Sequence, residues 1–182
     1  NMKIGIVGVH YGHISGMVTS ARGASNAEIV GIVEEDDTLY EQYTQESSIR
    51  RYGSLGEMLA EAVPDVVMEG LAHHEKVDAV EACAAAGVHV FLDKPLCRTM
   101  EEWGRIHRAV ETGGIRLTMF FTSRSHPPFI ALREAILAGE LGEIVSLIST
   151  HPHKLGGWAP DWYFDPSRYV GTFNDVACHG VD

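Results

Sequence analysis

Residues 3–13 read Lys-Ile-Gly-Ile-Val-Gly-Val-His-Tyr-Gly-His, an apolar run that ends in glycines and histidines. The apolar part, residues 3–9, is typical of a buried strand in a parallel sheet, because polar residues do not alternate within it. Gly8 can form a tight turn after this strand, and helical spacing follows from Ile14 to Ala21. The N-terminus of that helix would face the turn and could hold a phosphate group there.

Beyond this start, strand-like and helix-like segments alternate up to residue 121. We expect strands at residues 28–33, 65–69, 89–92 and 116–121, and helices at 38–45, 76–86 and 100–110. Ser54 opens a further short helix with a capping box, and Thr99 caps the helix that follows residue 99. Strands separated by helices form βαβ units with a mostly parallel sheet. The right-handed crossover rule then favours an α/β fold of the doubly wound Rossmann type.

The turn after the first strand departs from the dinucleotide-binding fingerprint, which would place glycines at positions 8, 10 and 13. Gly8 fits, but His10 and His13 occupy the other two positions. His10 puts a side chain where the backbone normally approaches a pyrophosphate, and Gly12 can shift that approach by two residues. We count Gly8, His10, Tyr11, Gly12 and His13 as candidate cofactor-binding residues.

Glu34 directly follows the second predicted strand. A carboxylate at this position can accept hydrogen bonds from the ribose hydroxyls of adenosine, and it repels the 2′-phosphate of NADP. The sequence offers no nearby arginine to receive that phosphate. The alternative interpretation, an acidic start to a helix, suits Asp36 and Asp37 better than Glu34. NAD is therefore the predicted cofactor, ahead of NADP.

Composition limits the classes of function. The chain has 182 residues, of which 45% are hydrophobic, and a formal net charge of −11. This charge argues against nucleic acids and anionic membranes as partners, and no apolar run approaches the ~20 residues of a membrane helix. The three cysteines lack paired spacing, which is typical of a reducing compartment. We expect a cytoplasmic protein that binds neither nucleic acid nor membrane.

A domain boundary is expected near residues 122–128, where serines and prolines interrupt the pattern. Residues 1–122 would form the dinucleotide-binding Rossmann domain, and residues 123–182 the beginning of a second α/β domain. That part contains a predicted helix at 129–137 and a predicted strand at 144–150. One strand cannot make a stable sheet, so we expect this strand to pair with another chain or remain an exposed edge. The chain is interpreted as a fragment or as a short protein that needs a partner.

Lys94, Asp175 and His179 carry the predicted chemistry. Lys94 follows the predicted strand 89–92 and therefore belongs at the carboxyl end of that strand, where open α/β sheets bind their ligands. Asp175 and His179 are four residues apart, so they would share one face of a helix. A lysine, a histidine and a carboxylate that orients them can together handle a proton.

These signatures resemble the Gfo/Idh/MocA family of nicotinamide-dependent oxidoreductases, which includes glucose–fructose oxidoreductase and inositol dehydrogenase. Residues 93–95, Asp-Lys-Pro, look like the family's Glu-Lys-Pro motif, and residues 171–179 resemble its glycine-led Asp-x-x-x-His segment. The resemblance covers nearly the whole chain. One departure is at residues 71–73, where Leu-Ala-His stands in place of Thr-Pro-Asn.

The resemblance implies a Rossmann domain and a larger α/β domain whose open sheet helps to form homo-oligomers. It also implies hydride transfer between a nicotinamide and a hydroxyl-bearing carbon of a sugar, a polyol or a similar small molecule. Lys94, Asp175 and His179 would be catalytic, and Leu71, His73, Asp93 and Lys94 would join the cofactor contacts. Two alternatives stay open: an NAD-assisted hydrolase or lyase of the same family, and a non-catalytic nucleotide-binding or regulatory protein.

The chemistry leaves open which group first takes the proton. Oxidation of an alcohol needs a base within hydrogen-bond reach of the hydroxyl. His179 has an unperturbed pKa near neutral pH, whereas Lys94 could relay the proton or stabilise the developing alkoxide. Asp175 would orient its neighbours.

Four residues are candidate substrate contacts: Arg124, His151, His153 and Trp162. Arg124 matches a familial arginine and would bind a substrate oxygen or hold the domain junction. His151 and His153 would contact substrate hydroxyls or act as polar loop residues. Together with His179 they could ligate zinc, but the family's chemistry needs no metal and none is expected. Trp162 could stack on a sugar or on the nicotinamide.

Overall fold

A computed structural model of the chain describes residues 1–10, 13–44, 48–157 and 159–182. Six parallel strands form one sheet in the order β3-β2-β1-β4-β5-β6, which is the doubly wound order predicted for a Rossmann domain. The strands are β1 (Met2–Val9), β2 (Ala27–Val33), β3 (Arg51–Tyr52), β4 (Val66–Gly70), β5 (His89–Asp93) and β6 (Leu117–Phe120). Five of them match the predicted strands. The sequence analysis missed β3, because two residues are too short to show a periodic pattern.

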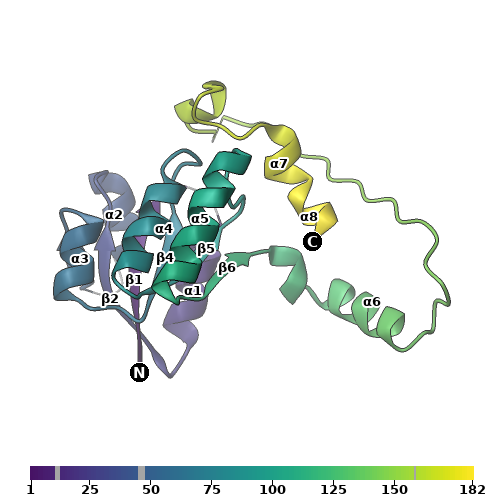
Figure 1. Cartoon of the computed structure of the whole chain (residues 1–182), viewed down its shortest axis with the longest axis horizontal. Coiled ribbons are helices and arrows are strands. Elements are labelled where there is room, and N and C mark those ends of the chain that lie inside the picture. The colour runs from purple at the N-terminus through teal and green to yellow at the C-terminus, as the bar shows by residue number, and fades with distance from the viewer. Residues whose placement is uncertain (11–12, 45–47, 158) are drawn as a thin grey trace.

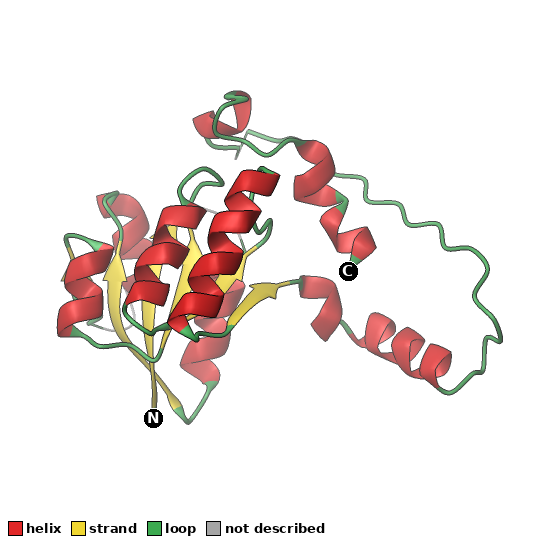
Figure 2. Cartoon of the chain, viewed as in Figure 1, coloured by secondary structure: helices red, strands yellow, loops and turns green. Residues whose placement is uncertain are grey.

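Helices cover both faces of the sheet (Figures 1 and 2). They are α1 (Ile14–Gly23), α2 (Asp37–Thr44), α3 (Leu55–Glu61), α4 (Lys76–Ala85) and α5 (Met100–Gly113). On one face, Met58, Val80 and Ile106 from α3, α4 and α5 pack in one buried cluster. On the other face, α1 and α2 pack against the sheet in a second cluster. Burial of both faces explains why the strands read as apolar runs.

The predicted helix caps are confirmed. The Ser54 hydroxyl accepts a hydrogen bond from the backbone N–H of Glu57 at 3.1 Å, and the Glu57 carboxylate accepts one from the N–H of Gly53 at 2.8 Å. The Thr99 hydroxyl accepts one from the N–H of Glu102 at 3.1 Å. Each contact satisfies a donor that a helix N-terminus leaves unpaired, so the chain after β5 is held in place as it enters α5.

In the second part of the chain, the described residues form α6 (Pro127–Leu137) and several shorter elements. These are η1 (Thr122–Ser125), η2 (Asp161–Phe164), α7 (Thr172–Val176) and α8 (Cys178–Val181). The predicted strand at 144–150 is wrong: these residues are exposed or nearly so, and no described strand lies beside them to supply hydrogen bonds. After α6 the chain loops away from the sheet and returns through η2 and α7 to its carboxyl edge (Figure 1). Within the described ranges, no helix is long and apolar enough to cross a membrane.

Candidate active site at the carboxyl edge of the sheet

Lys94 and Asp175 meet in a buried ion pair. Lys94 follows the last residue of β5, and Asp175 lies in α7, 81 positions later in the chain. The Lys94 Nζ lies 2.5 Å from the Asp175 Oδ1 and donates a second hydrogen bond to the Asp175 backbone oxygen at 2.8 Å. Both side chains are almost fully excluded from solvent. Through this contact, α7 lies across the carboxyl ends of the strands and holds Asp175 against Lys94.

An aromatic cluster surrounds the other side of Asp175. The Tyr169 hydroxyl donates a hydrogen bond to the Asp175 Oδ2 at 2.8 Å, and the His73 Nε2 lies 4.0 Å from the Asp175 Oδ1. Burial, followed by the positive charge of Lys76, lowers the pKa of His73 to about 3. His73 is therefore neutral at physiological pH. His73, a predicted cofactor contact, is fully buried and lies edge-on to the ring of Trp162, with 4.7 Å between centroids.

His179 lies in α8 rather than on one continuous helix with Asp175, because α7 ends at Val176. Its ring lies between Phe121, 5.5 Å away, and His13, 6.0 Å away, both measured between ring centroids. Burial, followed by the positive charge of Lys94, lowers the pKa of His179. The neutral imidazole is therefore favoured at neutral pH, which is the form that can accept a proton.

A second buried network lies below Lys94. Asp93 is fully buried, and its Oδ1 lies 3.0 Å from the Nδ1 of His13. The Lys76 Nζ donates to the Glu69 Oε2 at 2.7 Å and to the backbone oxygen of Asp93 at 3.0 Å. Sequence reasoning missed Lys76 and Glu69. The one signal was Glu69, a charged residue inside an otherwise apolar strand, which requires a buried partner.

A cavity of about 250 Å³ opens where β1 and β2 end. Gly8, His10, Glu34 and Leu71 line it, and the second part of the chain adds Arg168 and Trp162. Gly8 adopts φ +66°, and a Cβ on it would lie 2.5 Å from the Leu71 Cδ2, so only glycine fits this turn. A glycine at the end of β1, beside a helix N-terminus and a carboxylate, suits a dinucleotide. Tyr11 and Gly12 lie outside the described residues.

Glu34 is buried and points back into the first turn. Its Oε2 accepts a hydrogen bond from the N–H of Val9 at 2.9 Å, its Oε1 accepts one from the N–H of Asp36 at 2.9 Å, and the His10 Nε2 lies 3.3 Å from the same Oε1. The carboxylate thus joins the ends of β1 and β2. His10, placed where a glycine was expected, helps to hold it.

The expectation that no arginine lies near Glu34 is wrong, because the fold brings one to it from a later strand. Arg51, in the unpredicted strand β3, donates from its Nε to the backbone oxygen of Glu34 at 2.7 Å. Its other nitrogens bond the Asp37 carboxylate at 2.5 Å and the backbone oxygen of Glu35 at 2.7 Å. The guanidinium is therefore already bonded on three sides.

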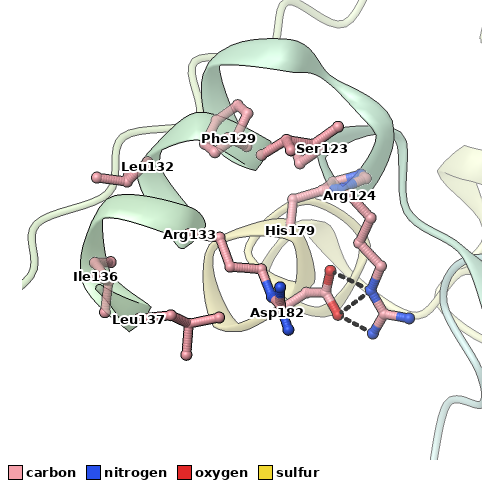
Figure 3. Close-up of a pocket in the computed structure, with 10 residues that line it drawn as sticks. Ser123, Arg124, Phe129, Leu132, Arg133, Ile136, Leu137, His179 and Asp182 are labelled. Carbon is pink, nitrogen blue, oxygen red and sulfur yellow. Dashed lines mark hydrogen bonds and ion pairs between the residues drawn. The ribbon is translucent and has the colours of Figure 1, made fainter. Parts of the chain in front are cut away.

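A larger cavity of about 620 Å³ lies on the other side of His179, between α6 and α8 (Figure 3). Arg124 lines it, but its Nε lies 2.9 and 2.8 Å from the two carboxylate oxygens of Asp182. Of the two roles considered for Arg124, this contact favours holding the junction. The apolar side chains of α6 form the opposite wall, as Figure 3 shows for Phe129 and Leu132.

The other candidate substrate residues are His151, His153 and Trp162, and they differ in how they lie relative to His179. The His151 ring is stacked near that of His179, with centroids 6.4 Å apart, and the His153 Nδ1 lies 3.4 Å from the backbone oxygen of His151. Trp162 is buried and lines the smaller cavity instead. Over the described parts of the chain, no group of three or more His, Cys, Asp or Glu side chains is arranged to hold a metal ion.

Comparisons with known proteins agree with this arrangement. The family profile described as "Oxidoreductase family, NAD-binding Rossmann fold" matches residues 2–121, and the profile of the "GFO/IDH/MocA C-terminal domain" matches residues 129–182. The D-xylose 1-dehydrogenase (NADP(+)) 2 of Haloferax volcanii is 30% identical over 181 residues, which are 99% of this chain and 55% of that protein. The levoglucosan dehydrogenase of Pseudarthrobacter phenanthrenivorans is 30% identical over 128 residues, 65% of this chain and 32% of that protein.

Among solved structures, a putative oxidoreductase from Erwinia carotovora atroseptica superposes with a TM-score of 0.90 at 21% identity, over 98% of this chain and 54% of that one. At this identity the likeness shows the fold. The chain spans about half the length of the Haloferax relative. From the two family profiles and the Haloferax alignment, we conclude that the chain belongs to the Gfo/Idh/MocA family of oxidoreductases.

Proposed function

We propose that this protein transfers a hydride between NAD and a hydroxyl-bearing carbon of a sugar, a polyol or a similar small molecule. The observation that carries the proposal is the buried Lys94–Asp175 pair with His179 beside it, at the carboxyl edge of a Rossmann sheet. The relatives support the substrate class, because their names include a xylose dehydrogenase, a levoglucosan dehydrogenase and a scyllo-inositol dehydrogenase. Since the chain spans about half of the first relative, the activity is proposed for the protein as a whole.

Gly8 and Glu34 are the residues proposed to hold the cofactor. Gly8 leaves room for the backbone to approach the pyrophosphate, and Glu34 lies within the same cavity, where a carboxylate can receive ribose hydroxyls. When bound there, a nicotinamide dinucleotide would supply the hydride acceptor.

His179 is the proposed base for the substrate hydroxyl. Its lowered pKa keeps it neutral and able to accept a proton. The Lys94 ammonium would stabilise negative charge that develops on the substrate oxygen. Asp175 would hold that ammonium in place through the 2.5 Å contact.

The test is an activity panel with NAD⁺ and NADP⁺. Pentoses, hexoses, inositols and anhydrosugars would each be incubated with the protein, with simple aliphatic alcohols as controls. We expect net formation of the reduced dinucleotide with at least one polyhydroxylated compound and none with the controls. Substrate cleavage without net reduction of the dinucleotide would instead establish the hydrolase or lyase alternative. Dinucleotide binding without any turnover would favour the non-catalytic one.

We also propose that the protein prefers NAD to NADP. Glu34 is a buried carboxylate at the end of β2, and the guanidinium of Arg51 is already bonded to Asp37 and two carbonyl oxygens. Calorimetric titration should show tighter binding of NAD⁺, and Glu34→Ala should narrow the difference because it removes the repulsion of the 2′-phosphate.

Glu28, an exposed glutamate near the start of β2 and at the opposite end of that strand from Glu34, gives the matched control: Glu28→Ala should leave the preference nearly unchanged. The Haloferax relative is an NADP(+) enzyme by name, so this preference would distinguish the two proteins. Equal or tighter binding of NADP⁺ by the unmodified protein would remove the proposal.

A further inference from the structure

The hydroxyl of Tyr169 is hydrogen-bonded to the second oxygen of the Asp175 carboxylate. Tyr169 lies between η2 and α7, and its Oη donates to the Asp175 Oδ2 at 2.8 Å. The Oδ1 of the same carboxylate bonds Lys94 at 2.5 Å. The two donors therefore engage both carboxylate oxygens, so the plane of the carboxylate is set from two sides.

Because Asp175 is buried, loss of its hydrogen bond to Tyr169 would cost free energy. Asp175 is only 4% exposed, so little solvent is available to replace a lost donor. A buried oxygen that loses its partner carries the cost of its desolvation, about 1–3 kcal/mol. Without the Tyr169 hydroxyl the Oδ2 would lose this 2.8 Å bond, and the carboxylate would be held less firmly about its terminal torsion angle, which is broad and soft. The contact with Lys94 would then be less firmly directed.

Tyr169 is itself held firmly. Its ring stacks on Tyr163 with centroids 4.6 Å apart, and on His73 with centroids 5.4 Å apart. The backbone N–H of the next residue, Val170, donates to the His73 Nδ1 at 3.3 Å. Burial, followed by the bond to Asp175, raises the pKa of Tyr169 to about 12, so the hydroxyl keeps its proton at physiological pH.

We propose that Tyr169 is a positioning residue, which fixes the carboxylate of Asp175 and through it the ammonium of Lys94. This inference rests on the proposed dehydrogenase function for its kinetic consequence, but the contact itself can be tested without turnover. Nothing in the sequence signatures pointed to Tyr169, because it lies outside both motif segments.

The kinetic test is Tyr169→Phe, which keeps the stacked ring and removes the hydroxyl. With the best substrate of the panel, kcat should fall about tenfold, in line with the loss of one hydrogen bond to a charged group. The KM of the substrate and the affinity for NAD should change little, because Tyr169 contacts neither site directly. Tyr163→Phe is the matched control: it removes a hydroxyl from the same cluster, leaves the Tyr169–Asp175 bond in place and should keep kcat near that of the unmodified protein.

The second test measures how fast the Lys94 amine reacts with a chemical reagent. An amine-reactive acylating reagent is applied to the free protein, and peptide mass spectrometry follows Lys94 with the exposed Lys3 as internal reference. In Tyr169→Phe, Lys94 should be acylated about tenfold faster relative to Lys3, because the looser carboxylate protects it less. Tyr163→Phe should match the unmodified protein.

Together, the two tests distinguish a failure of the proposed function from a failure of the positioning role. If the unmodified protein reduces no dinucleotide but Tyr169→Phe speeds the acylation of Lys94, the proposed function fails and the positioning role stands. If the protein is active, unchanged kcat or unchanged Lys94 labelling in Tyr169→Phe overturns the positioning role.

Discussion

Lys94→Met is expected to lower turnover by ~10²–10⁴-fold, the range typical of a group that moves or stabilises a proton in the transition state. Methionine keeps the apolar stem and removes the ammonium that contacts Asp175 at 2.5 Å. Steady-state rates with NAD and the best polyol would measure the effect. Lys3→Met is the matched control and should keep full activity, because Lys3 is exposed and lies near the start of β1, at the edge of the sheet opposite to Lys94.

The pair of Lys94 and His179 should also behave as a unit. If both groups act on one substrate oxygen, Lys94→Met combined with His179→Ala should cost much less than the product of the two single losses. Affinity for NAD should change little in His179→Ala. A multiplicative double loss would show that the two side chains act at separate steps.

The pH dependence of the proposed activity in the unmodified protein gives an independent check on His179. Its pKa is lowered, first by burial and then by the charge of Lys94, and the proton-accepting form exists above that pKa. The acid limb of the kcat/KM profile, which reports the free protein, should therefore lie below the ordinary histidine value of about 6.5. An acid limb well above that value would exclude His179 as the base.

Lys76→Ala is expected to produce the largest loss of stability, about 3–5 kcal/mol in the free energy of unfolding. Lys76 is fully buried and bonds the Glu69 carboxylate at 2.7 Å, so the variant leaves an unpaired carboxylate in the core. It also removes the 3.0 Å bond to the backbone of Asp93, next to Lys94. Urea unfolding followed by circular dichroism would measure the loss.

The pH dependence of this variant has a definite sign. Burial raises the pKa of Glu69 even beside Lys76, and removal of the ammonium raises it further. A carboxyl group with a raised folded-state pKa binds more protons in the folded state, so its penalty is full above that pKa and shrinks as the pH falls towards the unfolded value. The loss in Lys76→Ala should therefore become smaller as the pH is lowered from neutral towards the unfolded-state pKa of glutamate. The double variant Lys76→Met/Glu69→Leu should recover most of the stability, because it removes both charges.

The sequence predicted most of the Rossmann domain, because its signals are local. Apolar runs predicted β1, β2, β4, β5 and β6, and Ser54 and Thr99 marked the starts of α3 and α5 correctly. Lys94 was placed correctly at the end of its strand for the same reason, since a strand's direction fixes which end faces the ligand edge of a parallel sheet.

The parts that could not be predicted depend on partners distant in sequence. Residues 144–150 have a strand-like composition, but a strand forms only where a neighbouring backbone supplies hydrogen bonds. Arg51 lies 17 residues after Glu34, and only the short strand β3 brings it to the backbone of that residue. Tyr169 and Lys76 are ordinary residues in the sequence, and they gain their roles from packing that brings them to Asp175 and Glu69.

The long connection between Lys94 and Asp175 also sets the order in which the molecule can fold. The β1–β2 and β4–β5 pairs close loops of 25 positions (Met2 to Ala27) and 23 positions (Val66 to His89), whereas the ion pair closes a loop of 81 positions and carries a larger entropy of closure. The sheet can therefore assemble before α7 arrives, and we expect residues 161–179 to dock late onto the assembled sheet. We expect the same segment to open more readily than the sheet, and such a local opening would separate Asp175 from Lys94 while the Rossmann core stays intact.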